Sequence, residues 1–212
     1  MLNSSLKTLQ SAFHPSSLAS FLGKNRTLPD EGQDYFPIPA SSADIVVFSL
    51  LRWDLAFRRP QPLFRRFSRS HRVFYIEEPK FDSTHSYMQV AEPEHGLHVV
   101  TPHLSAKLTE SQIYFQLKVL IDNFFQEKQV ADFVLWYYSP MALPFSRHLH
   151  PKTIVYDCTE EFSVAPGAHP QLAKYERELL SRAELVFTDG QSLYNHKKEK
   201  HFNIHPFPSP ID

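Results

Sequence analysis

Three carboxylates follow one apolar run of the sequence within five residues. The run spans 153–156, and the acids after it are Asp157, Glu160 and Glu161. Carboxylates at the end of a strand can bind substrate hydroxyls or transfer protons. Asp157 comes directly after the run and is the candidate catalytic residue, with the two glutamates as candidate substrate ligands. Capping of a helix by Asp157 or Thr159, with the glutamates in its first turn, is the structural alternative.

A basic and aromatic cluster follows another apolar run, 45–48. Seven of the 11 arginines lie between positions 52 and 72. A helix beginning at Pro60 would present free N–H groups to an anion, and arginine adds paired donors for phosphate or carboxylate. A solvated basic helix, with its later arginines facing water, is the structural alternative. The candidate ligands of a sugar or sugar phosphate are Arg52, Trp53, Arg58, Arg59 and Gln61.

Two further carboxylates, Glu77 and Glu78, follow the apolar run 72–76. They are candidate acceptors of hydrogen bonds from substrate hydroxyls. Pairing with the nearby arginines is an equally good explanation of their position. Neither alternative is favoured by the sequence.

Composition excludes several classes of protein. The chain has 212 residues, a formal net charge of −1, one cysteine and five glycines. No two glycines lie close together, so a dinucleotide fingerprint and a P-loop are both excluded. The charge does not fit a nucleic-acid-binding protein. The single cysteine and the histidine spacing match no zinc motif, and we expect no metal site.

Apolar runs alternate with helical patterns from residue 44 onward. This alternation predicts an α/β fold, a Rossmann-like doubly wound and mainly parallel sheet. Thr109 and Gln112 form a capping box, and Thr188 with Gln191 could form another. The expected strands are 45–48, 72–76, 97–100, 132–138, 153–156, 184–187 and a short 203–207. The expected helices are 60–69, 109–124, one opened by Pro170, and 191–198.

The two parts of the chain differ in composition. Residues 1–43 are rich in serine and proline, and we expect a flexible N-terminal extension before a single domain at 44–212. A weak amphipathic pattern at 2–13 leaves peripheral contact with a membrane or a partner as the alternative. One cysteine and no long apolar run favour a cytoplasmic location, at the inner face of the membrane if that contact forms.

The parallel sheet predicts where the candidate residues meet. Ligands of such sheets bind outside the carboxyl ends of the strands. We therefore expect Trp53, Arg59, Glu78 and Asp157 to converge on one shared rim.

Three segments of the chain resemble a known family. They are WDLAFRRPQPLFRRFSRSHRVFYIEEP at 53–79, VYDCTEEFS at 155–163 and ELLSRAELVFTDGQSLYNHKKEKHFNIHPFPSPID at 178–212. In this order they resemble the N-terminal, acceptor-side domain of bacterial GT-B glycosyltransferases, family 1/4-like. That family commonly has Gln and His where this chain has Arg58 and Pro62.

The resemblance implies a function and a division of labour. It implies hexosyl transfer from a nucleotide-diphosphate sugar, a co-substrate and not a cofactor, to a cell-envelope or polysaccharide acceptor. A second Rossmann domain, expected to be missing from this chain and supplied in cis or in trans, would bind the donor. The chain alone would then be inactive. A stand-alone sugar- or anion-binding module and a different Rossmann-like enzyme, such as a sugar-phosphate isomerase, are the alternatives.

Overall fold

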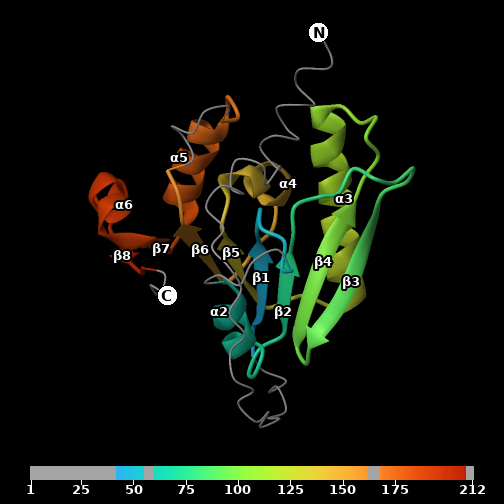
Figure 1. Cartoon of the computed structure of the whole chain (residues 1–212), viewed down its shortest axis with the longest axis horizontal. Helices are drawn as coiled ribbons and strands as arrows, with labels where there is room; N and C mark the ends of the chain where they lie inside the picture. The colour runs from blue at the N-terminus through green and yellow to red at the C-terminus, as the bar shows by residue number, and fades with distance from the viewer. Residues whose placement is uncertain (1–41, 55–59, 162–167, 209–212) are drawn as a thin grey trace.

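A computed structural model describes residues 42–54, 60–161 and 168–208 of the chain. They form an eight-stranded sheet with the order β3-β4-β2-β1-β5-β6-β7-β8 (Figure 1). Neighbouring strands are parallel except β3 and β4, which are antiparallel. From β1 the chain moves outward to β2 and later, through β5, to the other side, so the sheet is doubly wound. The predicted α/β class is confirmed.

The strands and helices alternate as predicted. The strands are β1 (Asp44–Phe48), β2 (Val73–Ile76), β3 (Tyr87–Glu94), β4 (Leu97–His103), β5 (Phe133–Tyr137), β6 (Thr153–Cys158), β7 (Leu185–Thr188) and β8 (Ile204–Pro206). The helices are α2 (Pro60–Phe67), α3 (Glu110–Lys128), α4 (Leu143–Ser146), α5 (Leu172–Arg182) and α6 (Gly190–Lys197), with a short 3-10 turn at Pro140–Ala142.

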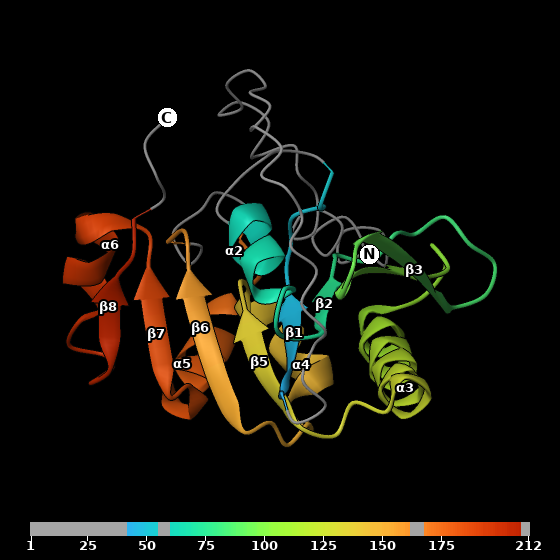
Figure 2. The same cartoon turned by 90° about the horizontal axis from the view of Figure 1, so that it is seen from below.

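Helices cover the two faces of the sheet unequally. Phe64 of α2 packs on one face with Val47 of β1 and Trp136 of β5. Helices α3, α4 and α5 cover the other face, where Val46 of β1 contacts a larger apolar core. Figure 2 shows α2 in front of the sheet and α4 and α5 behind it. Alternation along buried parallel strands supplies both cores, because successive side chains point to opposite faces.

The sequence did not predict β3. Most of its residues are exposed, so it has no apolar run that would mark it as a strand. It pairs with β4 through a turn in which Gly96 has a φ of 76°. A glycine adopts this left-handed conformation without a steric penalty.

The helix starts confirm one prediction and correct two. The Thr109 N–H donates to Gln112 Oε1 at 2.8 Å, so the predicted capping box is present at α3. Thr188 does not cap α6, because it is the last residue of β7 and Asp189 occupies the N-cap. Helix α5 begins at Leu172 and not at Pro170, since the segment before it forms a turn.

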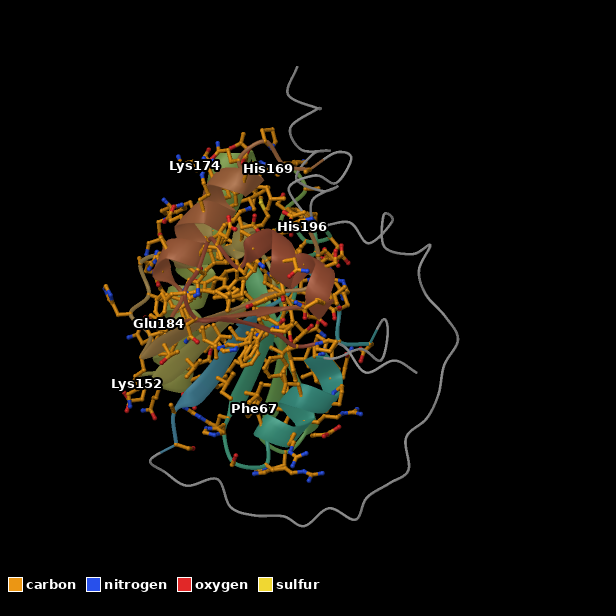
Figure 3. All side chains as sticks on the ribbon, turned by 90° about the vertical axis from the view of Figure 1, so that its left-hand side faces the viewer. Phe67, Lys152, His169, Lys174, Glu184 and His196 are labelled. Atoms are coloured by element: carbon orange, nitrogen blue, oxygen red, sulfur yellow. The ribbon has the colours of Figure 1, made fainter. Side chains whose placement is uncertain are left out.

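The predicted N-terminal helix and linker, and the arginines at 58 and 59, lie outside the described residues. Within the described ranges, no helix has the length and apolarity needed to cross a bilayer. Lys152 and Glu184 precede β6 and β7 and mark the amino edge of the sheet (Figure 3). The candidate residues lie at the opposite, carboxyl edge.

Candidate functional site

A pocket lies at the carboxyl edge of the sheet, where β1 neighbours β2 on one side and β5 on the other. Strands are added to one side of β1 first and then, from β5 on, to the other side, so the strand order reverses between β1 and β5. Open α/β sheets bind ligands at such a switch point. The pocket is small and partly open to solvent. Phe48 and Ile76 at the strand ends, Leu117 and Ile121 of α3, and Phe145 of α4 give it apolar walls.

Glu77 holds the turn beside this pocket together. Its Oε1 accepts a hydrogen bond from the Trp53 N–H at 2.6 Å. Its Oε2 accepts from Thr101 Oγ1 at 2.7 Å and from Arg52 Nη1 at 3.2 Å. Both oxygens of this buried carboxylate therefore have protein partners. Of the two explanations offered for Glu77, pairing with a nearby arginine matches these contacts.

Glu78 lines the same pocket and differs from its neighbour. Its side chain is 4% exposed, and its Oε1 lies 3.4 Å from Arg52 Nη2. Its Oε2 is buried and has no hydrogen-bond partner among the described residues. Burial raises the pKa of Glu78 to about 7, against the attraction of Arg52 and with the repulsion of Glu77. Near neutral pH this carboxyl can both accept and release a proton.

Trp53 and Gln61 lie on the α2 side of the edge. Trp53 is 5% exposed and packs edge-on against Tyr75, with ring centroids 5.0 Å apart. Gln61 Nε2 donates to the Trp53 carbonyl oxygen at 2.9 Å. The Trp53 indole is thus packed into the fold, and its contact with a sugar stays a prediction.

Asp157 is fully buried near the end of β6, opposite Phe187 of β7 in the strand register. Strand alternation directs its side chain to the face that carries Val155 and α2. Glu78 instead lines the pocket beside α3. The two carboxylates therefore share the carboxyl edge but not one face, which corrects the expected single rim.

Glu161 is paired with a buried lysine. Lys197 of α6 is fully buried, and its Nζ lies 3.0 Å from Glu161 Oε1 and 2.8 Å from Glu176 Oε1. Burial opposes the charge on Lys197, but Cys158 and the two glutamates together raise its pKa. Tyr156 Oη also donates to Glu176 Oε1, at 3.0 Å. This group of side chains ties α5 and α6 to the segment after β6.

The remaining predicted residues have separate positions. Arg66 and Arg69 are exposed, as the solvated-helix alternative has it, and Arg65 Nε pairs with Glu94 Oε1 at 2.6 Å. Glu160 follows β6, and its carbonyl oxygen accepts a weak hydrogen bond from Cys158 Sγ at 3.4 Å.

Sequence reasoning missed several residues of the edge. Ser139 lines the pocket directly after the predicted strand 132–138, a position that could have marked it. No feature of the sequence points to Thr101 or Lys197, since their roles depend on contacts between distant segments. In the part of the chain that the structure describes, no group of three or more His, Cys, Asp or Glu side chains is placed to hold a metal.

Comparison with known proteins gives matches only among solved structures. No family model and no curated protein matches the sequence. One similar structure is described as trehalose-6-phosphate from E. coli bound with UDP-2-fluoro glucose. The TM-score is 0.53 at 11% identity, over 80% of this chain and 49% of that chain.

A UDP-forming α,α-trehalose-phosphate synthase from Burkholderia xenovorans is also similar. Its TM-score is 0.45 at 12% identity, over 79% of this chain and 48% of that chain. The chain thus spans about half the length of these structures. At this identity the likeness to the first structure shows the fold alone, a Rossmann-like α/β fold with a mainly parallel sheet.

Proposed function

We propose that the chain is the acceptor-side, N-terminal domain of a GT-B glycosyltransferase, related to families 1 and 4. The reaction is transfer of a hexosyl group from a nucleotide-diphosphate sugar to a cell-envelope or polysaccharide acceptor. In this reaction the bond between the sugar and the diphosphate breaks, a bond to the acceptor oxygen forms, and the acceptor hydroxyl loses its proton. A second Rossmann domain, in cis or in trans, supplies most of the donor site.

One observation carries this proposal. A pocket with a buried carboxylate opens at the switch point of the sheet. The fold around it resembles about half of a protein solved with UDP-2-fluoro glucose. The ordered sequence motifs described above point to the same family. The likeness covers less than half of the solved chain, which fits a division between acceptor and donor domains.

The proposal gives the candidate residues separate roles. Asp157 remains the candidate catalytic residue, and Arg52 and Glu78 are placed to contact the acceptor at the pocket. The arginines at 58 and 59 belong to the same proposed cleft by resemblance. No metal or nucleic acid takes part, and the protein works in the cytoplasm, with the inner face of the membrane as a further location.

The proposal is tested with the gene product that carries this chain, together with any Rossmann domain encoded directly downstream. Release of nucleoside diphosphate from UDP-glucose and other nucleotide sugars is measured with and without saccharide acceptors. We expect acceptor-dependent release that falls at least about tenfold in Asp157→Asn. Asp132→Asn, at an exposed ion pair with Lys152, is the matched control. Absence of release with every donor would count against the proposed function. Full activity in Asp157→Asn would count against the catalytic role of Asp157.

A binding module without catalysis is the second candidate. The pocket is lined by residues of this chain alone, so ligand binding there needs no further domain. Saturable saccharide binding by the 212-residue chain, with no release of nucleoside diphosphate from any donor, would favour the module.

A further inference from the structure

The pocket beside Glu78 has mostly apolar walls and one buried polar atom in need of a partner. Glu78 Oε2 is buried without a hydrogen-bond partner among the described residues. Phe48, Leu117, Ile121 and Phe145 surround the space next to it. A carboxylate in such surroundings is costly unless it accepts a hydrogen bond. Glu78 Oε2 therefore needs a hydrogen-bond donor that the described residues do not supply.

The other polar side chains of the pocket already accept hydrogen bonds from the protein. Ser49 Oγ accepts from Tyr75 Oη at 2.7 Å and from the Leu51 N–H at 3.0 Å. Ser139 Oγ accepts from the Met141 N–H at 3.1 Å. Glu77 uses both of its oxygens, as described above. The two serine hydroxyls can still donate, but most of the remaining walls are apolar, so a ligand with many hydroxyl groups would leave several of them unpaired here, at a cost for each one.

We infer that this pocket binds an aliphatic or aromatic part of the acceptor that carries a single hydroxyl, with Glu78 accepting the hydrogen bond from that hydroxyl. The inference rests on the proposed function, since it assigns the pocket to the acceptor. Rotation about the last side-chain bond of glutamate is soft and exchanges its two oxygens. Either oxygen can therefore face the ligand while the other stays near Arg52.

Three six-membered-ring probes separate the ligand classes: cyclohexanol, methylcyclohexane and myo-inositol. They are titrated at pH 8 into the 212-residue chain with labelled methyl groups. Binding is followed at the methyl signals of Ile76, Leu117 and Ile121, which line the pocket. We expect cyclohexanol to shift these signals and to bind about tenfold more tightly than methylcyclohexane, because a hydrogen bond to a charged group has that magnitude. We expect no such shift with myo-inositol.

Variants then assign the preference to one side chain. Glu78→Leu should bind cyclohexanol and methylcyclohexane equally, whereas Glu78→Gln, which keeps an acceptor oxygen, should retain part of the preference. Glu127→Leu, on an exposed part of α3, is the matched control and should behave as the wild type.

Several outcomes would overturn the inference. Equal binding of the alcohol and the hydrocarbon by the wild type, stronger binding of myo-inositol, or no shift with cyclohexanol would each do so. The experiment needs no sugar donor. Its failure would therefore leave the transferase proposal standing, and a failed transfer assay would leave this binding result standing.

Discussion

The buried carboxyl of Glu78 should make the stability of the protein depend on pH in a way that one substitution removes. The pKa of Glu78 is raised from 4.5 to about 7, chiefly by burial. Below about pH 4.5 the carboxyl is protonated in both the folded and unfolded states, so it costs nothing. Between pH 4.5 and about 7 the unfolded state has lost the proton while the folded state keeps it, which favours unfolding. Stability therefore falls as the pH rises from 4.5 to about 7 and stays constant above that.

The magnitude follows from the displaced pKa. A move from 4.5 to about 7 corresponds to a loss of about 3 kcal/mol in the free energy of unfolding between pH 4.5 and pH 8. Arg52 and Glu77 are the charged groups that face Glu78, and their opposing effects are already contained in this pKa. Glu78→Gln removes the titration while keeping the size of the side chain.

Urea denaturation of the wild type and of Glu78→Gln at several pH values between 4.5 and 8 measures the effect. The variant should gain stability over the wild type as the pH rises, by about 3 kcal/mol over the whole window. Taking the difference between the two proteins cancels the titrating groups that do not interact with Glu78. Glu127→Gln, with a side chain that is 69% exposed, should show a constant difference. Parallel stability curves for the wild type and Glu78→Gln would refute the assignment of a raised pKa to this carboxyl.

Three further predictions concern the surrounding structure. Lys197→Met should destabilise the protein by about 3–5 kcal/mol, because it leaves the buried Glu176 carboxylate without its cation, and a small shift in the urea midpoint would contradict this. Cys158 should resist thiol reagents at pH 7.5 until the protein unfolds, since burial raises the pKa of its thiol to about 11; fast labelling of the folded protein would show otherwise. Leu117→Ala should cost about 2–5 kcal/mol because its side chain is 1% exposed, and a loss well below that in urea denaturation would mean that the wall of the pocket can collapse inward.

The parallel sheet could be predicted because burial on both faces leaves a direct mark on the sequence. The strands β1, β2, β5 and β6 are buried along nearly their whole length, so each is an apolar run. Strand β3 is mostly exposed at the edge of the sheet and pairs through its backbone, which the residue types do not reveal. An exposed edge strand that is held by backbone pairing therefore could not be predicted from the residue types.

The candidate site was predicted by position but not by orientation. Placing acids after strands located Glu77, Glu78 and Asp157 at the carboxyl edge, as the structure has them. It could not show that Glu161 would pair with Lys197, because that contact joins residues 36 positions apart. Nor could it show which face of the sheet each carboxylate would take, since this depends on where each strand ends.

The different fates of Glu77 and Glu78 follow from the same alternation that builds the sheet. Tyr75 and Ile76, the last two residues of β2, point to opposite faces and belong to different cores. The two acids continue this alternation past the end of the strand. Glu77 meets the Trp53 N–H and the Thr101 hydroxyl, which consume its hydrogen-bonding capacity. Glu78 lies in the pocket that Leu117 and Ile121 of α3 and Phe145 of α4 help to line, and these apolar side chains offer it no hydrogen bond.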